Sequence, residues 1–304
     1  MKSLLTMQQL SQKELFDILD TATELKAELK AGKKHEKRLD GMTLGMIFQK
    51  SSTRTRVSFE VGMQQLGGYP LFLSGNDLQL GRGESIKDTA RVFGRYLDGI
   101  MIRTFKQSDV EDLAKYSGLP IINGLTDYCH PCQVLADLLT IKEHKGGFDG
   151  LKACYIGDGN NMANSLTVGC LLSGMSFSLA TPEEYKPCDN IMRFGESYGG
   201  KFSWSTDIFE AADKADVIFT DVWASMGQEG EAEIRRKAFA GYCVDKKLLG
   251  VANSGCMLQH CLPAHKGEEI AEDVFEEHAN EIFDEAENRL HAQKAVMWLC
   301  MHKN

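Results

Sequence analysis

Residues 43–68 read TLGMIFQKSSTRTRVSFEVGMQQLGG, and the fold class can be predicted from this stretch. The apolar run at 43–48 predicts a buried strand, and the stretch from 53 to 66 predicts a helix that two glycines end at 67–68. A short polar turn joins the two. Strand–helix units of this kind build parallel sheets that are covered by helices on both faces.

The same alternation continues along the whole chain. In the first half, strands are expected at residues 43–48, 69–73, 99–103 and 120–123, with helices at 11–29, 53–66, 85–97 and 108–116. In the second half, strands are expected at 151–156, 176–180, 201–204, 216–220 and 257–261, with helices at 161–172, 191–198, 208–214, 231–239 and 288–300. Ser108 and Glu111 have the spacing of a capping box, which predicts that a helix begins at Ser108.

We therefore predict an α/β protein of two doubly wound parallel-sheet domains, residues 1–140 and 141–283. A length of 304 residues suits two domains, since single cores stop growing at about 250–300 residues. The hinge between them is expected to be a helix over residues 130–144, which Gly146 and Gly147 end.

Composition narrows the classes of partner. The net charge of −9 gives no help in binding nucleic acid or an anionic membrane, and no apolar run reaches the ~18 residues of a spanning helix. Nine cysteines at irregular spacing argue against a secreted disulfide framework. We expect a cytoplasmic protein without nucleic-acid or membrane partners. A mitochondrial matrix form whose presequence has been removed stays as the alternative.

The turn after the first strand predicts an anion site. A helix N-terminus presents free N–H groups and a partial positive charge, to which Ser52, Thr53 and Thr55 add hydroxyls. Arg54 adds a planar fork that suits phosphate oxygens. For an isolated string of this kind, a cluster of N-cap residues with solvated arginines is the more common interpretation.

Further polar residues lie at the ends of neighbouring strands. Arg103 ends the strand 99–103, and His130 with Gln133 begins the hinge helix. In open parallel sheets, ligands bind beyond the carboxyl ends of the strands, so these side chains are expected to reach one pocket. This convergence favours an anion site over a structural role for each residue alone.

Four motifs together resemble one family. Residues 51–60 (SSTRTRVSFE) are similar to the carbamoyl-phosphate signature shared by aspartate and ornithine carbamoyltransferases. Residues 130–133 (HPCQ), 260–263 (HCLP) and 285–290 (EAENRL) resemble further motifs of the ornithine type. The likeness runs through the whole chain.

The resemblance implies roles at the phosphate end. Carbamoyl phosphate would be held by Ser52, Thr53, Arg54, Thr55, Gln79, Arg103, His130, Gln133, Cys261, Leu262 and Arg289. Arg289 would return with a C-terminal helix in residues 284–304 that packs on the first domain. Residues 77–84 (DLQLGRGE), with Gln79, are similar to a loop that a neighbouring subunit lends to the site. A homo-oligomer is therefore expected, either a trimer or an assembly of trimers.

The amine end has weaker local signals. Residues 157–161 (GDGNN) begin like a dinucleotide fingerprint, but Met162 stands at its third glycine position, which argues against a nicotinamide enzyme. Taken alone, Asp221 slightly favours the interpretation of an Asx-type loop opening over that of a ligand-binding residue. The resemblance implies that ornithine is bound by Asn161, Asp221, Ser225, Met226 and Cys261.

The family chemistry is direct transfer of a carbamoyl group from carbamoyl phosphate to the δ-amine of ornithine in a closed cleft, giving citrulline and phosphate. Arg54, Arg103, His130, Asp221 and Cys261 are the expected catalytic residues. Asp221 and Cys261 would select the neutral amine, and Arg103 and His130 would stabilise the oxyanion. No cofactor or metal is expected. Aspartate, putrescine or an acylated ornithine remain alternative acceptors.

Residues 129–132 (CHPC) leave a rival of another class. A C-x-x-C pair in the cytosol can indicate thioredoxin-like chemistry or a zinc site. The pair lies late in a long α/β chain, and no second C-x-x-C completes a zinc site. We therefore prefer the carbamoyltransferase interpretation, with a non-catalytic homologue as a further alternative.

Overall fold

The computed structural model describes residues 1–33, 36–79, 83–224 and 229–302. The chain divides into two compact units: unit 1 is Met1–Leu139 with Glu287–Asn304, and unit 2 is Thr140–Ala286. The division falls within two helices, α5 (Pro131–Lys145) and α12 (Ala279–Met301). Each unit is an α/β structure with one parallel sheet, so the predicted fold class is confirmed.

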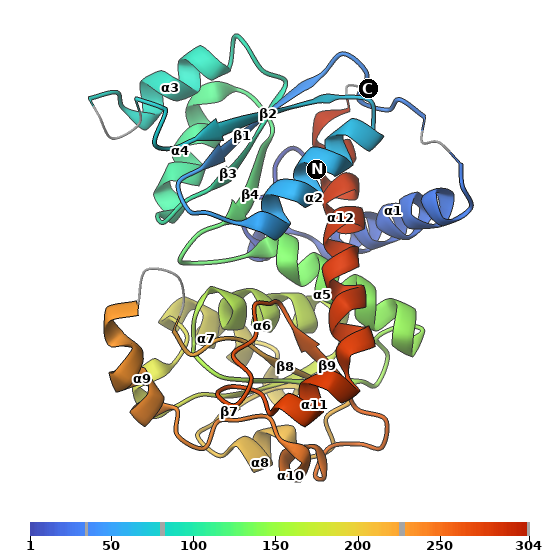
Figure 1. Ribbon diagram of the computed structural model, residues 1–304, viewed down its shortest axis with the longest axis vertical. Coiled ribbons are helices and arrows are strands. Elements are labelled where there is room, and N and C mark those ends of the chain that lie inside the picture. The colour runs from blue at the N-terminus through green and yellow to red at the C-terminus, as the bar shows by residue number, and fades with distance from the viewer. Residues whose placement is uncertain (34–35, 80–82, 225–228, 303–304) are drawn as a thin grey trace. The chain divides into compact units, whose positions relative to one another are not determined.

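The sheet of unit 1 has four parallel strands in the order β2-β1-β3-β4 (Figure 1). The strands are β1 (Thr43–Phe48), β2 (Tyr69–Ser74), β3 (Gly99–Arg103) and β4 (Ile121–Leu125). The chain moves from β1 to β2 on one side and then returns to β3 on the other. Phe48 pairs with Arg103, so β1 and β3 end at the same level at this change of direction, where ligands bind in open sheets.

The helices of unit 1 are α1 (Gln12–Lys30), α2 (Thr53–Gln65), α3 (Ile86–Phe93) and α4 (Gln107–Ser117). The second part of α12 packs against α1 and α2 (Figure 1). Lys26 donates to Asn288 Oδ1 at 2.7 Å, and Lys294 donates to Gln65 Oε1 at 3.0 Å. The expected return of the C-terminal helix to the first domain is confirmed.

One predicted helix start is wrong. The capping box expected at Ser108 does not form: α4 begins at Gln107 after Lys106, which makes no side-chain cap. The same spacing at Ser11 and Glu14 does form both bonds of a capping box at the start of α1. The spacing of two residues cannot distinguish the N-cap from the second helical position, and the backbone of Ser108 is already helical.

The sheet of unit 2 has five parallel strands in the order β7-β6-β5-β8-β9. They are β5 (Lys152–Ile156), β6 (Ser176–Ala180), β7 (Phe202–Ser205), β8 (Val217–Thr220) and β9 (Met257–His260). The helices are α6 (Asn161–Ser173), α7 (Asp189–Glu196), α8 (Ile208–Ala212), α9 (Ala232–Ala238), α10 (Lys246–Leu249) and α11 (Glu272–Glu277). The change of direction falls between β5 and β8, so a ligand site is expected beyond their ends.

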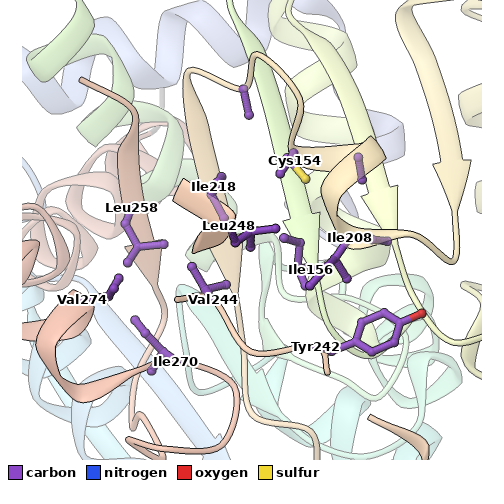
Figure 2. Close-up of a cluster of buried hydrophobic side chains, with 14 of the residues drawn as sticks. Cys154, Ile156, Ile208, Ile218, Tyr242, Val244, Leu248, Leu258, Ile270 and Val274 are labelled. Carbon is purple, nitrogen blue, oxygen red and sulfur yellow. The ribbon is translucent and has the colours of Figure 1, made fainter. Parts of the chain in front are cut away.

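A buried apolar cluster supports the sheet of unit 2 on one face (Figure 2). Ile156, Ile218 and Leu258 come from β5, β8 and β9, and Leu248 and Val274 come from α10 and α11. Full burial of such side chains is worth roughly 1.5–3 kcal/mol each. This packing holds the three strands whose ends carry the polar residues described below.

Side chains at the start of α12 accept hydrogen bonds from backbone N–H groups on the open edge of β9. The N–H groups of Leu258 and His260 donate to Glu281 Oε2 at 2.8 Å and Glu285 Oε2 at 2.9 Å. Two strand residues span about 6.6 Å and four helical residues about 6 Å, so the two spacings match. Burial alone would raise the pKa of Glu281, but hydrogen bonds from His278 and the Leu258 N–H outweigh it and lower the pKa.

Among the described residues, no helix combines the length and the apolar character needed to cross a membrane.

Candidate active site

The residues predicted to bind the phosphate group lie in unit 1, at the turn between β1 and α2. Ser52 is the N-cap of α2, and its hydroxyl accepts the Thr55 N–H at 3.2 Å. This bond fixes the first turn of the helix. Thr55 is buried, Arg54 is half-buried and Thr53 is exposed.

Arg289 joins three parts of unit 1 that are far apart in the sequence. From α12, its guanidinium donates to Gln133 Oε1 at 2.5 Å and to Thr55 Oγ1 at 3.1 Å. Gln133 in turn donates to Asp137 Oδ1 at 2.8 Å. The helix N-terminus, the start of α5 and the C-terminal helix therefore meet at one buried arginine.

His130 precedes α5 and is buried. Burial holds the pKa of His130 well below its ordinary value, and three guanidinium groups lower it further. These groups belong to Arg289, Arg103 and Arg54. The imidazole is therefore neutral and can donate one N–H, while the three arginines supply the positive field that an anion needs.

Arg103 and Gln79 differ in their placement. Arg103 ends β3 and is buried, and its charge lowers the pKa of His130. Gln79 is exposed on the segment after β2. Within the described residues, its backbone oxygen accepts from the Glu84 N–H, and no contact joins its side chain to the other expected residues.

The residues predicted to bind the amine substrate lie in unit 2, where three strands end. Asp221 follows β8 and is buried. Its Oδ1 accepts from the Val222 N–H at 2.8 Å and from Cys261 Sγ at 3.2 Å, after β9. Its Oδ2 accepts from Asn160 Nδ2 at 3.2 Å, after β5. Asn161 is the first residue of α6 and is half-buried. Ser225 and Met226 lie outside the described residues.

A buried ion pair lies next to this group. Arg235 of α9 donates to Asp158 Oδ2 at 2.8 Å and to the Trp223 oxygen at 2.9 Å. Burial raises the pKa of Asp158 to about 6, although the charge of Arg235 acts in the opposite direction. Arg235 could not be recognised from the sequence, because a charged residue in a short helix is usually part of a solvent-exposed face.

His260 positions the backbone after β9. Its Nδ1 accepts the Leu262 N–H at 2.9 Å, so Nε2 carries the proton that is donated to Glu269 Oε1 at 3.0 Å. Both side chains are fully buried. Leu262 has φ +59°, a left-handed conformation that a branched residue rarely adopts, and this hydrogen bond helps to hold it.

The cysteines do not support the redox or zinc interpretation. Cys129 and Cys132 are both free and buried, and burial raises the pKa of each thiol to about 12. Thiolates are the reactive and metal-binding form, so neutral thiols argue against both roles. Among the described residues, His265, Glu268 and Glu269 have ligand atoms close enough for a metal ion, and neither cysteine belongs to this group.

Two family models cover the chain. "Aspartate/ornithine carbamoyltransferase, carbamoyl-P binding domain" matches residues 2–143, and "Aspartate/ornithine carbamoyltransferase, Asp/Orn binding domain" matches residues 149–300. The chain is a carbamoyltransferase and belongs to the aspartate/ornithine carbamoyltransferase family.

Its relatives are named more narrowly. The chain is 54% identical to an ornithine carbamoyltransferase of Thermococcus kodakarensis over 99% of this chain and 96% of that one. It is 53% identical to one of Syntrophotalea carbinolica over 97% and 98%. Among solved structures, ornithine carbamoyltransferase from Pyrococcus furiosus matches with a TM-score of 0.93 at 51% identity, covering 99% and 97%. The anabolic enzyme from Campylobacter jejuni matches with 0.91 at 44%, covering 99% of each chain.

Proposed function

We propose that this enzyme transfers the carbamoyl group of carbamoyl phosphate to the δ-amine of L-ornithine, giving L-citrulline and phosphate. The observation that carries the proposal is the buried carboxylate of Asp221 beside the thiol of Cys261, a pair that suits an amine rather than a second carboxylate. The names of relatives at 52–54% identity over nearly the whole chain support the same acceptor.

In the proposal, residues 1–140 bind carbamoyl phosphate, with residues 284–304 completing that domain. The N–H groups at the start of α2 and the side chains of Ser52, Thr53, Arg54 and Thr55 hold the phosphate. The carbamoyl oxygen faces Arg103, Thr55 and the N–H of neutral His130. Arg289 fixes Thr55 and Gln133, because it donates a hydrogen bond to each of them.

Residues 141–283 bind ornithine in the proposal. Asp221 Oδ2 accepts one hydrogen bond from the described residues, so a carboxylate lone pair is left for the amine. Asn161, Ser225 and Met226 hold the amino-acid head group. Cys261 and the backbone of Leu262 lie beside the reacting atoms, where His260 fixes Leu262.

The reaction is a direct acyl transfer. The δ-amine has an ordinary pKa of about 10.4 and must lose a proton before it attacks, and desolvation assists this loss because burial disfavours a charged amine. A bond forms from the amine nitrogen to the carbamoyl carbon, and the bond from that carbon to the phosphate oxygen breaks. The proton that the nitrogen releases as this bond forms is taken up by the leaving phosphate. Negative charge builds on the carbamoyl oxygen, where losing one donor typically costs about 10²–10³ in rate. The proposal uses no cofactor or metal.

Four amines distinguish ornithine from the alternatives. At saturating carbamoyl phosphate, product formation would be measured with ornithine, aspartate, putrescine and N-acetylornithine. We expect ornithine to have the highest kcat/KM by at least about 100-fold, because aspartate would place a carboxylate against Asp221. A higher kcat/KM with any of the other three would overturn the choice of acceptor.

We also propose a cytoplasmic homotrimer, or an assembly of trimers, in which Gln79 acts in the site of a neighbouring subunit. Nine free cysteines suit a reducing compartment. The exposed position of Gln79, away from its own subunit's cluster, is what this sharing requires.

Mixed oligomers test the shared loop. Gln79→Ala and Arg54→Gly would each be inactive alone. After co-refolding, some sites would combine an intact Arg54 from one subunit with an intact Gln79 from another, so activity should return. If Gln79 serves its own subunit, the mixture stays as inactive as its components.

A further inference from the structure

Asn160 links two elements of unit 2 through one amide group. It is the N-cap of α6, and its Oδ1 accepts from the N–H groups of Met162 at 2.8 Å and Ala163 at 3.3 Å. Its Nδ2 donates to Asp221 Oδ2 at 3.2 Å. The resemblance singled out the next residue, Asn161, and left Asn160 without a role.

We infer that Asn160 is a positioning residue for the acceptor amine, because it fixes the orientation of the Asp221 carboxylate. The inference rests on the proposed function of Asp221. Val222 and Cys261 both donate to Oδ1, whereas Asn160 is the one described residue that donates to Oδ2. Without it, the carboxylate keeps donors on one oxygen only and loses a charge-assisted hydrogen bond in a buried place.

The choice of asparagine follows from this double contact. The other side chains that cap described helices are serines and aspartates: Ser11, Ser52, Ser85, Asp207 and Asp245. A cap needs only an acceptor, and Asp caps about as well as Asn. Asp at position 160 would place a second carboxylate against Asp221, and Ser is too short to reach it. Of these three capping residues, only asparagine can both accept from the helix and reach the carboxylate with a donor.

The turn that carries Asn160 is held from several sides. The Tyr155 hydroxyl donates to the Asp158 oxygen at 3.0 Å, and the Gly159 N–H donates to the Tyr185 oxygen at 2.9 Å. A Cβ at Gly159 would lie 2.3 Å from that Tyr185 oxygen, so only glycine fits. Asn160 therefore reaches Asp221 from a fixed backbone position.

Two substitutions separate capping from positioning. Asn160→Asp keeps the cap, removes the donor and adds a charge, whereas Asn160→Ser keeps a cap and removes the donor alone. Asp207→Asn, at the N-cap of α8, is the matched control for exchanging these two residues at a cap. The measurements are Tm, binding of carbamoyl phosphate by calorimetry, and kcat/KM for ornithine against pH.

We expect both Asn160 variants to keep carbamoyl-phosphate affinity within about twofold and Tm within a few degrees. The kcat/KM for ornithine should fall about 10- to 100-fold, the loss expected for a hydrogen bond to a charged group. In Asn160→Asp, the acid limb of the pH profile should also move to higher pH, because two neighbouring carboxylates resist ionising together. Titratable groups near Asp221 are Cys261, which donates to it, and Tyr155 and Asp158, whose pKa values its charge raises.

Unchanged ornithine kinetics in both variants would overturn the inference. So would a loss of kcat/KM that accompanies an equal loss of Tm and of carbamoyl-phosphate binding, because that pattern indicates a structural cap alone. An unaltered enzyme that does not use ornithine would instead refute the proposed function, and the two failures are therefore distinguishable.

Discussion

At the scale of single residues, positive charge and neutral hydrogen-bond donation belong to different side chains of unit 1. The arginines provide the charge, and His130 stays neutral because burial and those arginines lower its pKa. A neutral imidazole can donate a hydrogen bond to an oxyanion without adding a positive charge that the arginines would repel. The same cluster explains why substituting one arginine should change chemistry more than folding.

Arg54→Gly should reduce kcat/KM for carbamoyl phosphate by at least about 10³-fold, since it removes a charged fork from the proposed site of the leaving phosphate. Arg54 is half-buried at the helix start, so Tm should change by only a few degrees. Arg56→Gly, at an exposed position two residues later, is the control. Near-normal turnover in Arg54→Gly would refute the phosphate assignment.

The raised pKa of the Asp158 carboxyl group predicts that the stability of the protein depends on pH. Its pKa is raised from 3.8 to about 6, so the folded protein binds this proton more tightly than the unfolded chain. The stability that results is fully present below pH 3.8 and is lost as pH rises through about 6.

Asp158→Asn removes this titration and also leaves Arg235 without its partner, so it should be less stable at every pH. The difference in free energy of unfolding from the unaltered protein should shrink by up to about 3 kcal/mol between pH 4 and 7. Urea titrations at several pH values measure it. A difference that stays constant with pH would show that Asp158 does not titrate in this window.

At the scale of elements, α12 serves β9 through backbone groups. Strands on a sheet edge expose N–H groups, and Glu281 and Glu285 accept two of them at the spacing that a helix provides. This contact also fixes His260, whose side chain holds Leu262. The positions of the strands were largely predictable, because they depend on neighbouring residues, but the one capping box predicted, at Ser108, does not form. The early start of α12 at Ala279, nine residues before the expected 288, was not predictable.

Glu285→Ala should destabilise the protein by about 1–3 kcal/mol, because the buried N–H of His260 loses its acceptor. Glu196→Ala, at the exposed end of α7, is the control and should stay within about 0.5 kcal/mol. Chemical denaturation gives both values. Equal stability of the two variants would mean that the carboxylate does not support the edge of the sheet.

At the scale of the whole molecule, both units place their polar residues where the strand order changes direction. This arrangement follows from topology, since the ends of β1 and β3 coincide in one sheet and those of β5 and β8 adjoin in the other. A ligand at either place binds only the folded chain, so it should stabilise that chain by mass action.

Inorganic phosphate should therefore raise Tm by a few degrees at about 100 times its Kd, equivalent to about 2.7 kcal/mol. The gain should disappear in Arg54→Gly and persist in Asn160→Ser, because only the first substitution lies among the anion residues. Thermal unfolding with and without phosphate, at constant ionic strength, measures it. An equal gain in both variants would place the phosphate elsewhere.

The two parallel-sheet domains, the polar turn at Ser52 that begins a helix, and the family could all be recognised in the sequence alone. These features depend on periodicity and on residues that are close along the chain, where the local sequence largely sets the backbone geometry. The folded structure was needed to see that Arg289 bonds to Thr55 across 234 residues and that Asn160 bonds to Asp221 across 61 residues. A hydrogen bond needs positions accurate to a few tenths of an ångström, and strand register and helix packing set them.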